Sequence, residues 1–319
     1  MKIQHRPFLP DLERGGEKEY ELTSFCVKIT NIQAVAYVGF AYFCVFTGIA
    51  LMIVTNIRNH NYHGALAFGS LNVLNISYSP NYEIISLYQT IVVFYVSVYY
   101  ISVDLIATGL LVHIAFQFKM VQNNFQRVVY NAYREMCKSD IHDSLSLNFE
   151  TFSKGYETVT PLIRWKYLRS SLQKAAKYHA AVLRLMNDME EMFSLMYLVQ
   201  FSTLMIVMCF EIYNATAVDN TLDIIFSLAQ CVTLLLQLLL TCFWAEYVLH
   251  EGVQVSSAVY HSHFVGTDVR FQKGLVLVIQ RSQREATLTA GNMATVKLAT
   301  MAWIIKSAYS AFMMMRSLK

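Results

Sequence analysis

Long, uninterrupted apolar runs constrain the fold of this chain more than any other feature. A helix that crosses a bilayer needs about 20 predominantly apolar residues, and the run from Ala34 to Ile57 contains no Lys, Arg, Asp or Glu. Four later runs are also long enough, although Lys306 interrupts the last of them. The pattern predicts five spanning helices, over residues 34–57, 84–118, 192–213, 224–249 and 298–318.

The composition agrees with a membrane protein. Of the 319 residues, 55% are hydrophobic and 15% are charged, whereas soluble domains carry about 25% charged residues. The predicted fold class is therefore all-α, a polytopic membrane helix bundle. The net charge of +3 is too small to indicate a nucleic-acid partner. The six Cys show no metal or redox spacing, which favours buried free thiols.

Lys and Arg predict the orientation, because they concentrate in cytoplasmic loops. The segment 119–191 is rich in both, whereas the connection between the third and fourth runs has neither. We therefore expect a cytosolic N-terminus and an extracellular C-terminus. The sequons at Asn75 and Asn214 fall in loops that this rule places outside, so both are candidate glycosylation sites.

Residues 119–191 show apolar residues at helical spacing, with charged residues between them. This predicts a cytosolic helical loop in which the second and third spans continue beyond the membrane. Such helices could join subunits or form a solvated hairpin on one chain, and periodicity favours neither. We expect a cytosolic N-terminal segment over residues 1–28 and one transmembrane domain over residues 29–319.

The sequence carries no constellation typical of an enzyme, such as a phosphate-binding glycine loop or a nucleophile elbow. His261 and His263 form a His-x-His pair, but no acidic or thiol partner is nearby in the sequence. We expect that pair to lie in a solvated loop. The prediction is a protein without enzymatic activity, cofactor or metal.

Asp104 lies inside the second predicted span, where a carboxylate is costly unless it is paired, protonated or in a polar interior. It could belong to an ion or ligand path. It could also be a buried hydrogen-bonding anchor between helices. We favour the anchor, because proton-coupled carriers tend to have several such groups.

The last predicted span has a weakly polar side. At 100° per residue, one third of its circumference carries Thr300, Ser307, Ser310, Met314 and Ser317. Such a stripe suits a water-filled path shared by several subunits. It equally suits a seam between helices, where small and hydroxyl residues also gather.

Several motifs resemble those of insect odorant receptors. "IQRSQREATLTAG" (Ile279–Gly291) and "IIKSAYSAFMMMRSL" (Ile304–Leu318) resemble the C-terminal signature of that family. "SPNYEIISLYQ" (Ser79–Gln89) and "AVYHSHF" (Ala258–Phe264) resemble two further elements. The chain departs from the usual pattern at Glu285, Phe264 and Ala311. Since the family has seven spans, the resemblance implies that the first two are missing here, as in a fragment, a truncated gene model or a short isoform.

The resemblance implies a ligand-gated, non-selective cation channel in the cell membrane of olfactory sensory neuron dendrites. Tuning receptors of this family assemble with an obligate co-receptor into a hetero-tetramer surrounded by membrane lipid. The last span lines the pore, which implies pore residues at Ser307 and Ser310, a gate at Met314, and a mouth lined by Ser317 and Leu318.

The family's ligand pocket lies between spans in the outer half of each subunit. By depth and chemistry, the expected walls here are Phe43, Phe46, Thr47, Ala50, Phe94, Ser97, Val98, Ile101, Phe226 and Gln230. Aromatic and aliphatic groups with a few polar atoms suit a small volatile ligand. Each residue could instead serve only in helix packing.

Two other classes remain open. A secondary transporter is disfavoured by the missing inverted repeat and the lone intramembrane carboxylate. A G-protein-coupled receptor is disfavoured by the predicted cytosolic N-terminus.

Overall fold

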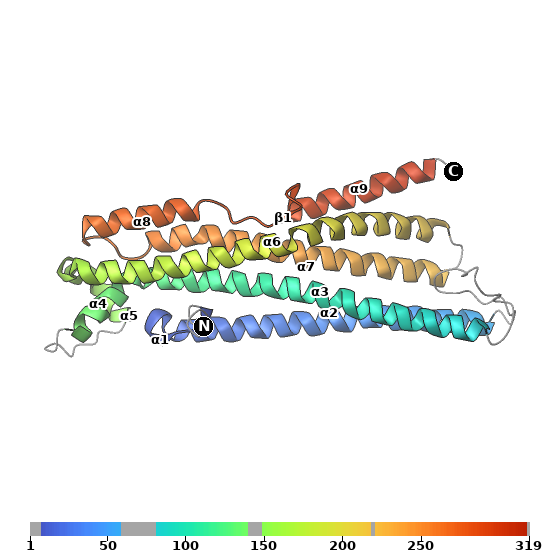
Figure 1. Ribbon diagram of the computed structural model, residues 1–319, viewed down its shortest axis with the longest axis horizontal. Helices are drawn as coiled ribbons and strands as arrows, with labels where there is room; N and C mark the ends of the chain where they lie inside the picture. The colour runs from blue at the N-terminus through green and yellow to red at the C-terminus, as the bar shows by residue number, and fades with distance from the viewer. Residues whose placement is uncertain (1–7, 59–80, 140–148, 218–220, 318–319) are drawn as a thin grey trace. The chain divides into compact units, whose positions relative to one another are not determined.

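A computed structural model describes residues 8–58, 81–139, 149–217 and 221–317. These residues are almost entirely helical (Figure 1). The elements are α1 (Leu12–Gly15), α2 (Glu17–Arg58), α3 (Asn81–Gln126), α4 (Val128–Ser139), α5 (Phe149–Val159), η2 (Thr160–Leu162), α6 (Trp165–Ala217), α7 (Thr221–Tyr260), α8 (Val269–Ser282), β1 (Thr289–Ala290), β2 (Ala294–Thr295) and α9 (Leu298–Ser317).

Four long helices dominate the described part of the chain. Helices α2, α3, α6 and α7 contain 42, 46, 53 and 40 residues. All four are long and apolar enough to cross a membrane, and within the described residues they are the helices that meet this criterion. A fifth span in α9, like the orientation, stays a prediction.

The helix bounds extend the sequence-based prediction. Helix α3 runs through residue 118 to Gln126, and α6 begins at Trp165, well before residue 192. The second and third apolar runs therefore do continue into longer helices, as their periodicity predicts. Helix α2 begins at Glu17, so the domain boundary predicted at residue 29 falls inside a helix.

Capping and breaking residues set the ends of the short helices. The Asp11 carboxylate accepts a hydrogen bond from the Glu13 backbone N–H at the start of α1, and Asp268 does the same for Arg270 in α8. These bonds satisfy N–H groups that lack a partner in the first helical turn. Pro161 lies in the first turn of η2, where the missing backbone N–H costs nothing.

The chain divides into two compact units. Unit 1 contains residues 1–30, 109–198 and 242–298, and unit 2 contains residues 31–108, 199–241 and 299–319. Each long helix therefore contributes one segment to each unit.

Unit 1 has an aromatic and aliphatic core. Its fully buried side chains include Phe116, Phe118, Phe125, Phe152, Leu168, Met186 and Phe271. Helix α8 packs against α6 within this unit, since a Cβ atom on Gly274 would lie only 2.6 Å from Cδ2 of Leu172.

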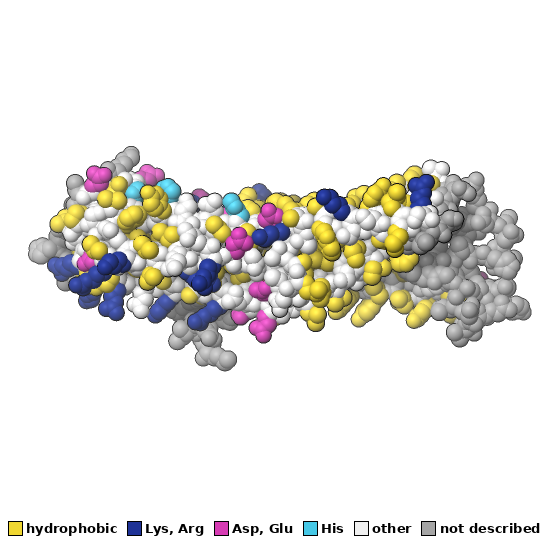
Figure 2. Space-filling model, turned by 90° about the horizontal axis from the view of Figure 1, so that it is seen from above, with side chains coloured by type: hydrophobic (Ala, Val, Ile, Leu, Met, Phe, Trp, Pro, Cys, Tyr) yellow, Lys and Arg dark blue, Asp and Glu magenta, His cyan; other side chains and the backbone are white. Residues whose placement is uncertain are grey.

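Unit 2 has a smaller core in which Tyr37, Ala41 and Ile101 pack together with Val38, Leu105 and Leu240. Its outer surface is apolar, with exposed Ile91, Tyr95, Ile206, Phe210 and Trp303. Most Lys and Arg residues belong to unit 1. The same difference in surface chemistry is visible in Figure 2, where yellow and dark blue side chains gather in different regions. Unit 2 therefore has the surface expected of a membrane-embedded part.

Candidate functional site

Helices α2 and α3 meet along an aromatic seam in unit 2. The rings of Tyr42 and Phe94 stack with their centroids 6.0 Å apart, and the Phe46 ring lies 6.4 Å from that of Tyr42. Further along the seam, Ile101 is buried against Tyr37 and Ala41. Stacked rings gain dispersion energy beyond the burial of their area. The seam is thus an apolar surface on which Phe46 and Phe94 remain exposed.

A buried polar cluster continues this seam. Gln200 donates a hydrogen bond from Nε2 to Oδ1 of Asp104 over 3.0 Å, and the Tyr37 side chain lies beside the same carboxyl group. Asp104 is 5% exposed. Gln237 lies beside Asp104, although its Nε2 has no hydrogen-bond partner among the described residues. Helices α2, α3, α6 and α7 each supply one member of this cluster.

The arrangement agrees with the anchor interpretation of Asp104. A buried carboxyl group is tolerated only when hydrogen bonds replace its hydration, and here its neighbours come from three other helices. Tyr37, Gln200 and Gln237 were not predicted from the sequence. Each stands alone in an uncharged apolar run, and the one available signal was the need of Asp104 for donors on neighbouring helices.

Helix α9 packs through one face only. Ile304, Ala308 and Phe312 are buried on that face. At 100° per residue, the predicted polar stripe is centred about 130° around the helix from it. On the stripe, Ser307 is half-buried, while Ser310, Met314 and Ser317 are exposed. The stripe is therefore left uncovered by the residues of unit 2.

The start of α9 is held in unit 1 by polar contacts. The backbone N–H of Leu298, the first residue of α9, donates to Oε2 of Glu246 in α7 over 2.9 Å. Just before it, strands β1 and β2 pair in an antiparallel hairpin. The backbone N–H of Gly291 in that hairpin donates to both the carbonyl oxygen and Oγ of Ser194 in α6, over 2.9 and 3.0 Å.

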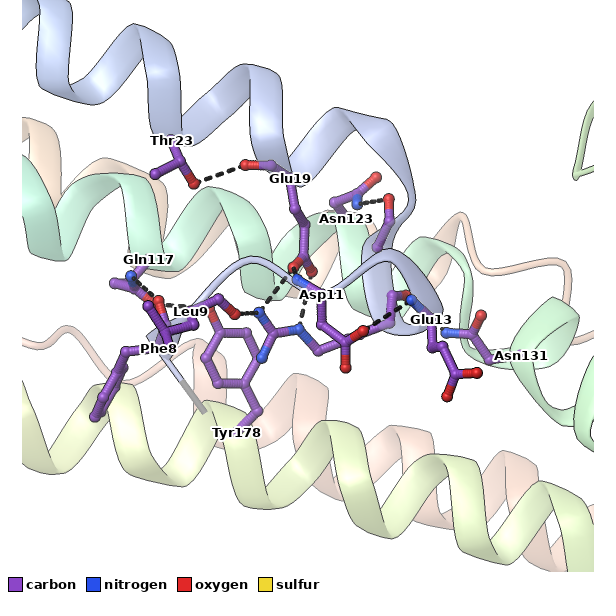
Figure 3. A network of polar contacts seen from close by, with 12 residues as sticks. Phe8, Leu9, Asp11, Glu13, Glu19, Thr23, Gln117, Asn123, Asn131 and Tyr178 are labelled. Carbon is purple, nitrogen blue, oxygen red and sulfur yellow. Dashed lines mark hydrogen bonds and ion pairs between the residues drawn. The ribbon is translucent and has the colours of Figure 1, made fainter. Parts of the chain in front are cut away.

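A second polar network of unit 1 fastens the N-terminal segment, residues 8–16 (Figure 3). The Arg14 guanidinium donates two hydrogen bonds to Glu19, whose side chain is fully buried, and lies 4.1 Å from the centre of the Tyr178 ring. Asn123 and Asn131 donate to the carbonyl oxygens of Gly15 and Arg14.

The charges of this network are mutually stabilised. Burial lowers the pKa of Arg14, but its hydrogen bonds and charge interaction with Glu19 outweigh that effect, and the pKa lies above its ordinary value. At the exposed edge of the network, a hydrogen bond from Lys138 and its charge lower the pKa of Glu13. Arg14 therefore remains a cation that neutralises the buried Glu19 carboxylate.

Comparisons with known proteins decide which family has this architecture. A family model described as "7tm Odorant receptor" matches residues 2–309. This chain belongs to the odorant receptor family. Odorant receptors 85b and 19a of Drosophila melanogaster are 27% and 25% identical to it, over 54% and 52% of this chain. The matched segments cover 45% and 42% of those relatives, so the chain spans less than half of their length.

The fold of this odorant receptor chain is also found in a solved structure. The insect olfactory receptor OR5 from Machilis hrabei, in complex with eugenol, superposes with a TM-score of 0.72 and 15% sequence identity. The superposition covers 94% of this chain and 70% of that one. At this identity the likeness concerns the fold alone. Family membership places the chain among receptors and not among enzymes.

The odorant receptor structure gathers only some of the predicted ligand-binding residues. Phe46, Phe94 and Ile101 lie on the α2–α3 seam, with Ser97 and Val98 half-buried on α3. Phe43 is 65% exposed and Ala50 is also exposed. Thr47 donates to the carbonyl oxygen of Cys44. Gln230 is half-buried on α7, and the Phe226 side chain lies outside the described residues.

The remaining predicted sites differ in their placement. Asn214 is exposed, but it lies in the last turn of α6, so the loop predicted around it begins later than expected. Asn75 and Leu318 lie outside the described residues. His261 is exposed beyond α7, and the His263 ring lies 4.5 Å from that of Tyr156. No group of three or more His, Cys, Asp or Glu side chains in the described ranges could hold a metal ion.

Proposed function

We propose that this chain is the odorant-binding subunit of a ligand-gated, non-selective cation channel formed with an obligate co-receptor. The proposal includes a hetero-tetramer in the plasma membrane of olfactory sensory neuron dendrites, five spans in this chain, a cytosolic N-terminus and an extracellular C-terminus. It rests chiefly on α9, whose stripe of hydroxyl and methionine side chains faces away from its own packed face.

A pore-lining helix must present weakly polar groups to water while the rest of its surface packs against protein or lipid. Helix α9 meets that requirement within a family of receptors. On this proposal Ser307, Ser310, Met314 and Ser317 line the conduit, Leu318 lies at its mouth and Met314 forms the gate. Each subunit of a tetramer would contribute one such helix.

The proposed ligand is a small volatile molecule that binds at the α2–α3 seam. Aromatic rings of Phe46 and Phe94 supply dispersion contacts, and Ser97, Thr47 and Gln230 supply hydrogen-bonding groups. The solved relative from Machilis hrabei binds eugenol, a fact that supports this ligand class. Binding would act by favouring an arrangement in which the pore helices are further apart.

Cysteine accessibility tests the pore. The chain is co-expressed with the co-receptor, and Ser310→Cys and Met314→Cys variants are exposed to a water-soluble methanethiosulfonate during voltage-clamp recording. We expect reaction to block at least half of the ligand-evoked cation current, because both positions lie on the stripe. A matched control is Ala302→Cys, which is exposed but lies about 110° around α9 from the centre of the stripe.

The control variant should retain its current after the same treatment. Equal sensitivity of Ala302→Cys and Met314→Cys, or insensitivity of both stripe positions in resting and stimulated channels, would rule out the proposed pore face. Uptake of a solute without ligand-evoked current would favour a transporter instead.

A further inference from the structure

The residue immediately before α9 has no side chain that can accept a hydrogen bond from the first helical turn. The residue before Leu298 is Lys297, whose side chain can only donate hydrogen bonds. The usual residues at this position are Ser, Thr, Asp and Asn, because their side-chain oxygen accepts from a backbone N–H two or three residues further on. Here the acceptor comes from another helix, because the Glu246 carboxylate accepts from the Leu298 N–H over 2.9 Å.

The carboxylate suits this position in a second way. The aligned peptide dipoles leave partial positive charge at a helix N-terminus, so an anion there is stabilised. Glu246 belongs to α7. Lys297 makes its ion pair with a different residue, Glu285, over 3.2 Å. The contact of Glu246 therefore joins the start of α9 to α7 and does more than complete a local turn.

The hairpin before α9 fixes the same point from α6. Besides the two hydrogen bonds from Gly291 to Ser194, Thr289 donates from its hydroxyl to Oε1 of Glu190 over 2.7 Å. Gly291 has a φ of +59°, and a Cβ atom there would lie 2.5 Å from Cδ2 of Leu198. Only glycine combines this backbone conformation with so close an approach.

We propose that Glu246 is a positioning residue for the pore helix: it caps α9 from α7 and, together with the Ser194–Gly291 contact, sets where that helix begins and how easily it moves. This inference rests on the proposed function of α9 in the pore. Because the Lys297 side chain cannot accept a hydrogen bond, the Glu246 carboxylate is the acceptor that holds the Leu298 N–H at the start of α9. Loss of Glu246 should therefore loosen the start of α9 and shift the balance between closed and open channels.

The test compares Glu246→Ala with the double variant Glu246→Ala/Lys297→Ser. Serine at 297 supplies a side-chain acceptor for the N–H of Ala299 or Thr300, so it should restore much of the first-turn stability that the loss of Glu246 removes. Hydrogen exchange by mass spectrometry on the chain in nanodiscs follows residues 296–302. We expect about fivefold faster exchange there in Glu246→Ala, because the loss of a cap costs about 1 kcal/mol, and a return toward the parent rate in the double variant.

Recording with the co-receptor adds a functional measure. Glu246→Ala should change the basal current or the half-maximal ligand concentration by about threefold or more, and Lys297→Ser should reverse much of that change. Glu285→Gln is the matched control. It removes the ion pair of Lys297 with Glu285, which Lys297→Ser also removes, and it leaves Glu246 unchanged. A merely structural role would lower the number of surface channels without shifting the half-maximal concentration, and rescue by a new cap would not occur.

The outcomes separate the two proposals. Unchanged exchange in Glu246→Ala, or failure of Lys297→Ser to restore it, overturns the capping role. Faster exchange in Glu246→Ala that Lys297→Ser reverses supports the capping role. If the parent chain then shows no ligand-evoked current, the proposed channel function is wrong, and the gating role of Glu246 falls with it. If Glu246→Ala does not fold, Glu246→Gln, which keeps an acceptor but no charge, should show a smaller acceleration in the same segment, and no acceleration counts against the role.

Discussion

A buried carboxyl group and the hydrogen bonds around it set the strictest demands on individual residues in unit 2. Asp104 accepts a hydrogen bond from Gln200 and lies beside Tyr37, and both Asp104 and Tyr37 are buried. Removing one partner leaves the others with an unmet hydrogen bond, which costs about 1–3 kcal/mol for each buried group. The cluster therefore couples four helices through a few atoms.

Substitution of Asp104 should distinguish shape from hydrogen bonding. In Asp104→Asn the amide oxygen still accepts from Gln200, so we expect a small loss of stability. In Asp104→Ala the Gln200 amide loses its hydrogen-bond partner and the space beside Tyr37 is emptied, so the free energy of unfolding should fall by about 2–4 kcal/mol. Thermal denaturation of the detergent-solubilised protein, followed by size-exclusion chromatography, measures the difference. Equal midpoints for the two variants would contradict an anchoring role.

The sequence reveals Asp104 but not its surroundings. A lone acidic residue in an apolar run is conspicuous, whereas Gln200 and Gln237 resemble many uncharged polar residues that face a neighbouring helix. Their roles depend on how four helices are rotated relative to one another, and this rotation is set by packing of the whole unit. In the same way, Gly291 is part of a recognisable motif, but the closeness of Leu198 is visible only in the structure.

At the scale of elements, hydrophobicity predicts the existence of the long helices and says little about their ends. The apolar run from Ala34 to Ile57 lies within α2. Its N-terminal extension to Glu17 contains several charged residues, and the buried Glu19 in it is bound by the N-terminal segment. Strands β1 and β2 were not predicted, because two-residue strands carry no detectable alternation.

The N-terminal segment gives a prediction about the base of α2. Arg14→Ala leaves Glu19 as a buried carboxylate without its cation, which should destabilise the protein by about 3–5 kcal/mol. Arg14→Lys keeps the charge but cannot donate the same pair of hydrogen bonds to Glu19, so we expect an intermediate loss of stability. Midpoints of thermal aggregation, measured in parallel for the variants, check the order.

Lys138→Ala is the matched control for that series. Its partner Glu13 is exposed, so water screens the pair and its loss should change stability little. A loss of stability as large as that of Arg14→Ala would show that the exposure of an ion pair does not decide its contribution.

At the scale of the whole molecule, the open question is which ends of the helices face the cell exterior. We expect an impermeant maleimide to label Asn214→Cys on intact cells and Lys166→Cys only after permeabilisation, because the Lys- and Arg-rich segment is predicted to be cytosolic. Both positions are exposed in the structure. Labelling is compared with the parent chain, whose own six cysteines set the background.

Loss of an endoglycosidase-sensitive mobility shift in Asn75→Gln or Asn214→Gln would give independent support for that orientation. Labelling of Lys166→Cys on intact cells would reverse it and would place the proposed pore mouth inside the cell.

The division of the chain into units gives α9 a distinct mechanical position. The other segments of unit 2 belong to helices that run on unbroken into unit 1, so displacing any of them means bending or tilting a long rod. Helix α9 instead follows a short hairpin and turn, where rotation about a few backbone torsions suffices. Reorienting α9 therefore requires rotation at that connection and repacking of its buried face, without the bending of a long helix.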